Sequence, residues 1–194
     1  MPFTPYHFGP SSWIGLSLFR IFDFSTLLVA SVIIDIEPFC VFFFNAPWRL
    51  HGFLHSFLGG SIAAILTAIV LYLLKDKIRK VMAVFKLSQN SSFKKILLTS
   101  FSGIYFHILL DAPLYNDITP FYPLQSNPLY GIISSQAIYH FCSLSFIVGL
   151  LAYLIRLLII KGKNADWVTA YDERSKDSTS FHTNAFGNFF IRKR

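Results

Sequence analysis

The sequence predicts an all-α protein: a polytopic membrane helical bundle with about three full spans and a short N-terminal helical hairpin. Of its 194 residues, 54% are hydrophobic and only 14% are charged, whereas a water-soluble domain carries about 25% charged residues. The 17 Lys and Arg residues lie mostly in two blocks that flank apolar stretches. Cytoplasmic segments of membrane proteins have this pattern, whereas a nucleic-acid-binding protein collects its basic residues on one folded face. The composition therefore argues against nucleic acid as a partner.

Three apolar stretches are long enough to cross a bilayer, whose hydrocarbon core of about 30 Å needs about 20 helical residues. The clearest is 57–74, which carries no charge and ends at Lys75. The others are 96–112 and 129–160. The last of these is long enough to tilt or to extend beyond the bilayer. We expect each stretch to form a membrane-spanning helix.

The first fifty residues are less regular. The apolar stretches 11–19 and 24–34 are each only about ten residues long, and Arg20 and Asp23 separate them. Such lengths are too short for an upright span, so they predict a helical hairpin packed on the other helices. From residue 161 the composition becomes polar and basic. We therefore expect a membrane-embedded domain over 1–160 and a partly disordered tail over 161–194.

The distribution of positive charge predicts the orientation of the chain in a cell membrane. Seven basic residues lie within 75–95, and the tail is also basic. Both segments should stay in the cytoplasm, because cytoplasmic loops carry the excess of Lys and Arg. The segment 113–128 contains no Lys or Arg, so we expect it on the extracytoplasmic side.

Ionisable residues within the apolar part of the chain are functional candidates, since burying one costs several kcal/mol unless it has a partner or a metal. Two pairs have the spacing of metal ligands one helical turn apart: His51 with His55, and His107 with Asp111. The complete set is His7, Asp35, Glu37, His51, His55, His107, Asp111, Asp117 and His140.

The two pairs are expected at the same depth, because the helices that carry them run in opposite directions. At about 1.5 Å of rise per residue, His51 should lie level with Asp111, and His55 level with His107. Asp35, Glu37 and His7 fall at the same outer boundary. Imidazoles and carboxylates without a thiolate suit Zn²⁺ or another divalent transition ion, and six ligands could hold one or two ions.

Several alternatives stay open at this point. The polar residues could be helix ends that reach for water, Glu37 could orient a ligand or act as the general base, and Asp117 could be a surface carboxylate. His140 has no acidic residue one turn away, which favours a buried, hydrogen-bonded imidazole. Cys40 and Cys142 lie in apolar runs and are expected to be small core residues without a disulfide or metal role.

Four short blocks of the chain resemble a known family. They are TPYHFGP at 4–10, DIEP at 35–38, LHGFLHS at 50–56 and HILLD at 107–111. In this order they are similar to the YdjM-like family of inner-membrane metal-dependent hydrolases, over about residues 4–124. The resemblance implies a metal site with Glu37 nearby, and its metal-site residues would be His7, Asp35, His51, His55, His107 and Asp111.

The two ligand pairs also resemble those of the all-helical zinc-dependent phospholipase C enzymes, which implies phosphoester hydrolysis. We therefore expect a membrane-bound hydrolase of a phosphoester or lipid-linked substrate, with Asp35 or Glu37 accepting the proton of the attacking water. Two other classes compete with this interpretation. A divalent metal-ion transporter would place ligands near the membrane midplane, where only His140 is available. A non-catalytic membrane scaffold would make the His and Asp residues dispensable.

Overall fold

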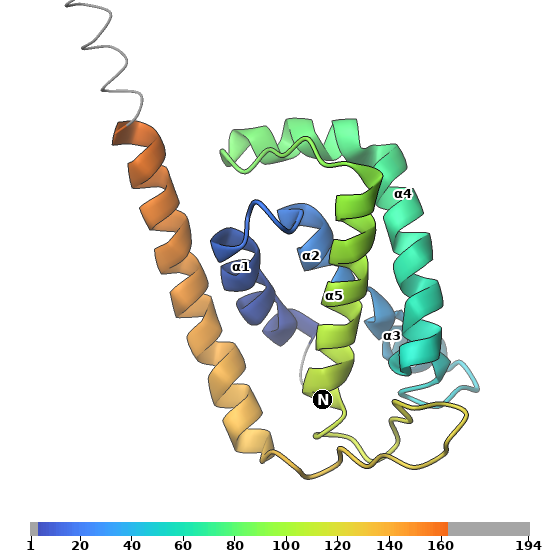
Figure 1. Cartoon of the computed structure of the whole chain (residues 1–194). Coiled ribbons are helices and arrows are strands. Elements are labelled where there is room, and N and C mark those ends of the chain that lie inside the picture. Colours follow the sequence, from blue (N-terminus) through green and yellow to red (C-terminus); the bar gives the residue numbers. More distant parts are fainter. Residues whose placement is uncertain (1–3, 163–194) are drawn as a thin grey trace, which may run out of the picture. The chain divides into compact units, whose positions relative to one another are not determined.

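The computed structural model describes residues 4–162, and within this range it contains helices and connecting turns but no strand (Figure 1). The all-α prediction is confirmed. Contacts divide the chain into two units, Met1–Tyr153 and Leu154–Arg194. The expected tail over 161–194 lies almost entirely outside the described residues. The helices are, in order, η1 (Thr4–His7), α1 (Phe8–Ser17), α2 (Phe24–Ala30), η2 (Ile33–Asp35), α3 (Ile36–Phe44), η3 (Phe53–His55), α4 (Phe57–Val84), α5 (Phe93–Asp111) and a last helix over Ser135–Gly162.

Within residues 4–162, four helical segments are long and apolar enough to cross a membrane, so the chain is a multi-pass membrane protein. They are Phe24–Phe44, Phe57–Val84, Phe93–Asp111 and Ser135–Gly162. The last span begins six residues later than the expected start at residue 129, because the preceding chain forms turns.

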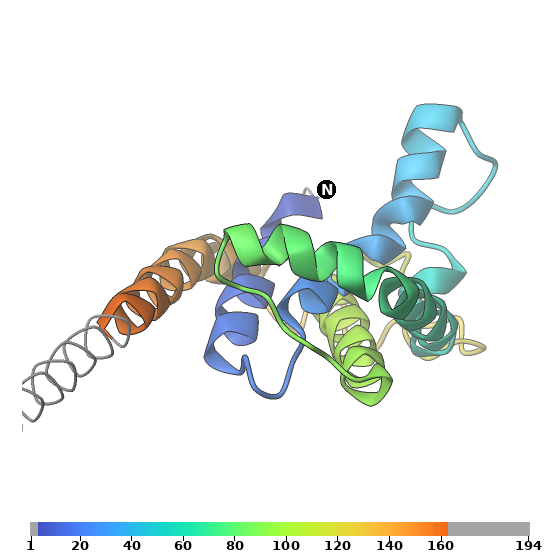
Figure 2. The same ribbon diagram turned by 90° about the horizontal axis from the view of Figure 1, so that it is seen from above.

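The span Phe24–Phe44 is the one that the sequence did not predict. It comprises α2, a break at Ser31 and Val32, the short η2 and then α3. The charges of Asp35 and Glu37 suggest a helix end at residue 34, yet α3 begins directly after Asp35 and continues to Phe44. The helix tolerates these carboxylates because both find partners inside the protein, as described below. Figure 2 shows α3 projecting away from α4 and α5, and it carries highly exposed aromatic side chains such as Phe42 and Phe44.

Small residues bring α2, α4 and α5 close together around one apolar core. A methyl group on Gly103 of α5 would lie 2.7 Å from the Cβ atom of Ala30 in α2. On α4, a methyl group at Gly60 would lie 2.9 Å from both Ile104 and Ile108. Since such contacts are shorter than van der Waals packing allows, glycine is required at both positions for this helix spacing.

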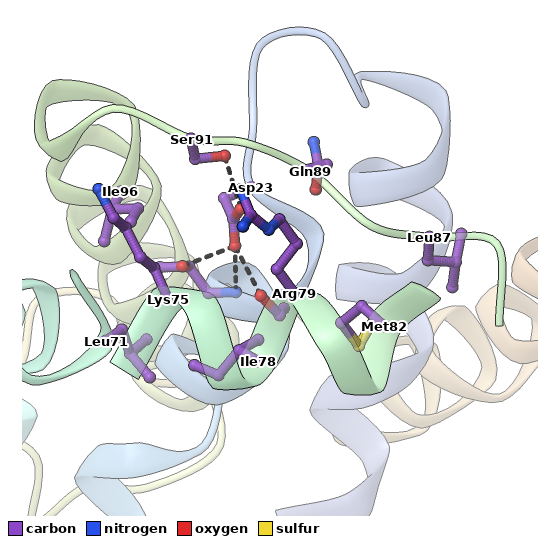
Figure 3. A pocket seen from close by; sticks show the side chains of 12 residues that line it. Asp23, Leu71, Lys75, Ile78, Arg79, Met82, Leu87, Gln89, Ser91 and Ile96 are labelled. Carbon is purple, nitrogen blue, oxygen red and sulfur yellow. Dashed lines mark hydrogen bonds between the residues drawn. The ribbon is translucent and has the colours of Figure 1, made fainter. Parts of the chain in front are cut away.

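The turn between α1 and α2 is fixed by Asp23, which is buried beside Ser91 of the segment before α5 (Figure 3). Its carboxylate caps α2 by accepting the backbone N–H of Thr26 at 2.9 Å, and it also accepts the hydroxyls of Ser25, Thr26 and Ser91. Its own backbone N–H donates to Thr99 Oγ1 on α5 at 3.1 Å. Burial alone would raise the pKa of Asp23, but hydrogen bonds from Ser91, Thr26 and Ser25 hold it below its usual value.

A cavity beside Asp23 is lined by Lys75 and Arg79 from α4 (Figure 3), but its volume is only about 20 Å³. This is room for about one water molecule. The hydrogen bonds of Asp23 therefore hold together the start of α2, the segment before α5 and α5 itself, and they do not form a ligand site.

We predict that Asp23→Asn lowers the free energy of unfolding by about 1–3 kcal/mol at pH 7, because an amide cannot accept all of these hydrogen bonds. Since folding lowers the pKa of Asp23, its contribution is present above its unfolded pKa of about 3.9 and is lost as pH falls below that value. Thermal unfolding of the purified protein in detergent, at pH 7 and below pH 4, measures both effects.

Asp76→Asn is the matched control, since Asp76 is exposed and pairs only with exposed Arg79 on the same helix. It should change the unfolding free energy by less than about 0.5 kcal/mol. Equal losses in the two variants would contradict the role assigned to Asp23.

Candidate metal centre

Four side chains, three buried and one half-buried, meet where α4 begins and α5 ends: His55, His107 and Asp111, with the half-buried Asp35. Each offers one ligand atom, and these atoms all lie within 4.8 Å of one another. The side chains of His55 and His107 are fully buried, and that of Asp111 is 3% exposed. The group could hold a metal ion, because carboxylate oxygens and imidazole nitrogens are ordinary ligands of divalent cations.

The four residues come from three parts of the chain. His107 and Asp111 lie one turn apart on α5, as predicted. His55 ends η3, directly before Ser56 caps α4 by accepting the backbone N–H of Gly59 at 2.9 Å. Asp35 ends η2 at the junction with α3. The antiparallel arrangement brings the rings of His55 and His107 to a centroid distance of 5.5 Å, so these two residues meet at one level as expected.

Three of the distances between ligand atoms are close to those around a tetrahedral ion. With bonds of about 2.0–2.1 Å, as for zinc, neighbouring tetrahedral ligands lie about 3.3 Å apart. In the structure, Asp35 Oδ1 lies 3.3 Å from His107 Nε2 and 3.6 Å from His55 Nε2. Asp111 Oδ2 lies 3.4 Å from His107 Nε2. Both Nε2 atoms are buried without a hydrogen bond, which is costly unless a cation accepts their lone pairs.

The other nitrogen of each imidazole is held by the protein. His107 Nδ1 lies 2.7 Å from the carbonyl oxygen of Ser31. Since a carbonyl only accepts, Nδ1 carries the proton and Nε2 presents its lone pair to the centre. His55 Nδ1 lies 2.9 Å from Glu37 Oε2 in the same manner. Burial lowers the pKa of His55, but the carboxylates of Asp35 and Glu37 more than offset this and hold it above its usual value.

Glu37 has the contacts of a positioning residue. In addition to its contact with His55, its carboxylate accepts hydrogen bonds from the backbone N–H groups of Gly52 at 3.0 Å and Leu54 at 2.9 Å. A Cβ atom on Gly52 would lie 2.9 Å from Glu37 Oε1, so glycine gives the carboxylate room to approach. Glu37 therefore fixes the backbone before α4 and, with it, the ring of His55. Of the two roles left open by the sequence, this geometry favours orientation of a ligand over proton transfer.

His7 lies next to the four residues, as its place in η1 brings it against α5. Its ring stacks on that of His107 with centroids 3.9 Å apart, and its Nε2 lies 3.3 Å from Asp111 Oδ1. Neither ring nitrogen makes a hydrogen bond, although the residue is buried. His7 is thus the residue best placed to add a fifth ligand.

His51 takes a different place from the one expected. Residues 51 and 52 lie outside any helix and η3 is a single turn, so His51 and His55 do not share a helix face. Instead, His51 Nδ1 lies 3.0 Å from both carboxylate oxygens of Asp117, and its ring packs on Tyr115. Burial and the neighbouring His55 lower the pKa of His51, and Asp117 offsets this only in part. Asp117 is an exposed carboxylate, as one alternative from the sequence had it, and it pairs with His51.

The expectation of a buried imidazole at His140 is wrong, because little of the helix Ser135–Gly162 is buried. His140 is exposed, and its Nε2 lies 3.4 Å from the amide nitrogen of Gln136 one turn earlier. Both cysteines are free, as expected: Cys142 is buried and Cys40 is half-buried.

Two contributors to the site have little or no signal in the sequence. The carbonyl of Ser31 orients His107, and a backbone group carries no sequence pattern at all. Arg49 lines a pocket next to Glu37 and His51. The only feature of the sequence that singles it out is its distance from other basic residues. It is the sole Lys or Arg in the segments 1–19, 21–74 and 96–155.

No protein-family model, no curated protein and no solved structure matches the chain. The resemblance to the YdjM-like family stays a prediction.

We predict that His55→Ala and Asp111→Ala each abolish stoichiometric binding of Zn²⁺. Loss of one ligand leaves the remaining acid and imidazoles without adequate coordination of the cation that compensates for their burial. Metal analysis of purified protein after zinc loading and desalting in detergent measures this. The control is His140→Ala, which removes an exposed imidazole outside the cluster and should retain wild-type zinc. Full zinc content in both ligand variants would rule out this centre.

Proposed function

We propose that the chain is a membrane-embedded, metal-dependent hydrolase whose centre holds one Zn²⁺. The observation that carries the proposal is the pair of buried imidazoles with Nδ1 fixed and Nε2 unpaired beside two carboxylates. Nitrogen and oxygen ligands without a thiolate, with three pairs of ligand atoms at 3.3–3.6 Å, favour zinc among the divalent ions. One ion accounts for the four-residue cluster, and His7 lies beside it as a candidate fifth ligand.

An ion held by these residues would polarise the bond under attack and promote loss of a proton from the attacking water. Asp35 is the best placed proton acceptor. Its Oδ1 faces the two imidazoles, whereas its Oδ2 makes no hydrogen bond. In hydrolysis, the water oxygen would bond to the phosphoryl or acyl centre and one water proton would pass to Asp35. Asp35 would then pass this proton to the leaving oxygen as the bond between that oxygen and the centre breaks.

The position of the centre favours a hydrolase over the two other classes. His55 precedes the first residue of α4, and Asp111 is the last residue of α5. The ligands thus lie at the ends of spans, whereas a transporter is expected to bind its ion near the midplane. A scaffold has no use for five buried ionisable side chains, each of which is expensive in a membrane protein.

The resemblance of the ligand blocks to the YdjM-like hydrolases and the zinc-dependent phospholipase C enzymes supports the same proposal and points to phosphoester chemistry. The position of the centre further favours a lipid-linked substrate, because a centre at the ends of the spans is accessible from the membrane surface. We further propose that this end faces away from the cytoplasm, since the opposite end carries the basic segment 75–95.

The hydrolase proposal predicts zinc-dependent cleavage of lipid phosphoesters by the purified protein. Chelation should abolish turnover and added Zn²⁺ should restore it. Glu37→Gln separates orientation from proton transfer: if Glu37 only positions His55, zinc affinity falls about 10- to 100-fold and saturating zinc restores most of the turnover.

Asp35→Asn is the companion variant and should stay inactive even in excess zinc. Turnover that survives chelation, or that survives in Asp35→Asn at wild-type rate, would contradict the proposed chemistry. A Glu37→Gln variant that binds zinc normally but cannot be rescued would instead make Glu37 the base.

The orientation is tested with single cysteines at the exposed positions Ser88 and Ser126, in a chain whose Cys40 and Cys142 are replaced by alanine. A membrane-impermeant thiol reagent applied from the extracytoplasmic side should label residue 126 and leave residue 88 unlabelled until the membrane is opened. The reverse pattern would show that the metal centre faces the cytoplasm.

A further inference from the structure

Two hollows lie against the first turn of α3, beside the metal centre. The larger has a volume of about 840 Å³ and is lined by Glu37, Arg49 and His51, among others. The smaller is a groove of about 390 Å³ between the start of α1 and the segment α2 to α3. Its lining is apolar except for Asp35. Ile36 lines both hollows, which therefore lie on either side of its side chain, next to Asp35 and Glu37.

The groove reaches the ligand with the most exposed side chain. The side chain of Asp35 is 12% exposed, compared with 3% or less for those of His7, His55, His107 and Asp111. The remaining lining of the groove includes Val29, Val32 and Phe39. A molecule that reaches Asp35 along the groove therefore contacts hydrocarbon over most of its length. A hydrocarbon chain fits these walls, and a hydrophilic substrate does not.

The larger hollow contains a cation with no acidic partner. Arg49 is exposed, and none of the ion pairs among residues 4–162 involves it. It is also far from the other basic residues in the sequence, as noted above. Trp48, Tyr122 and Gln125 share the hollow and add aromatic faces and an amide. The planar guanidinium fork suits the oxygens of a phosphate group, which it binds through two hydrogen bonds.

We propose that Arg49 and the apolar groove are the two recognition elements for a lipid with a phosphate-bearing headgroup. This inference rests on the proposed hydrolase function and adds the residues that select its substrate. Arg49 binds the phosphate in the larger hollow, and the hydrocarbon chain lies in the groove that ends at Asp35. Because Glu37 lines the larger hollow and Asp35 the groove, a lipid that occupies both passes over the first turn of α3, beside the metal centre.

A binding experiment tests the substrate class without requiring turnover. The probe is a hydrolysis-resistant phosphonate analogue of a short-chain phosphatidic acid, added to the zinc-loaded protein in detergent. Trp13 and Trp167 are replaced by phenylalanine, so that the fluorescence of Trp48 reports on the larger hollow. The probe should bind saturably, and Arg49→Gln should weaken it roughly 10- to 100-fold, as expected for lost charge-assisted hydrogen bonds. Arg49→Lys should weaken binding of the probe less than Arg49→Gln does, because it keeps the positive charge.

Two further variants make the test specific. Val29→Phe narrows the groove and should weaken the phosphonate lipid, while leaving the binding of inorganic phosphate unchanged. Arg79→Gln removes an exposed cation on α4 and should bind the probe like the parent chain. All variants should retain stoichiometric zinc, so that a loss of binding is not a loss of the metal centre.

Three results would overturn the inference: unchanged probe affinity in Arg49→Gln, inorganic phosphate binding as tightly as the phosphonate lipid, or a neutral diacylglycerol competing equally well. Binding that follows the expected pattern in a protein without hydrolytic activity would support the lipid site and count against the hydrolase proposal alone. The two proposals can thus fail separately.

Discussion

The structure depends on one constraint: two carboxylates and three imidazoles are packed together where water is largely excluded. Burying one such charge costs several kcal/mol. Burying two carboxylates that both approach the same imidazole, as Asp35 and Asp111 approach His107, costs more. A divalent cation balances the charge of Asp35 and Asp111 and accepts the lone pairs of neutral imidazoles. The cluster is therefore close to electrically neutral with a metal, and without one it must take up protons. This balance makes a metal the simplest reason for such a group inside an apolar bundle.

The irregular backbone near the centre serves the same constraint. A helix break exposes carbonyl groups, and in a membrane protein each of them needs a partner inside the fold. The end of α2 supplies such a carbonyl at Ser31, which accepts His107 Nδ1. This contact follows directly from helix packing, because Gly103 of α5 lies against Ala30 of α2. Gly103 is one turn before His107, and Ala30 is one residue before Ser31. A larger residue at position 103 would separate α5 from α2 and move the imidazole away from its acceptor.

Regular elements could be predicted from the sequence much better than the connections between them. α4, α5 and the pair His107 and Asp111 follow from apolar stretches and from one-turn spacing on a helix. The same spacing argument fails for His51, because it holds only within a helix and the chain before η3 is not helical. The partner of His51 is Asp117, 66 residues away, and no local pattern indicates such a pairing. Likewise, Asp35 and Glu37 suggest a helix end only as long as their partners are unknown. These partners lie in distant segments of the chain, and the local pattern of apolar residues gives no information about them.

The ligands of the centre differ in what holds them, and this difference constrains the chemistry. Glu37 and Ser31 hold the Nδ1 atoms of His55 and His107, so the imidazoles cannot turn to meet a substrate. The Oδ2 atom of Asp35 makes no hydrogen bond, and the side chain of Asp35 borders the apolar groove. An incoming molecule therefore meets a carboxylate before it meets an imidazole. A carboxylate in that position repels an anionic group unless a cation lies behind it, so approach of a phosphate depends on the metal and on Arg49 together. Under the proposed function, occupation of the centre by an ion would then be a condition for substrate binding as well as for hydrolysis.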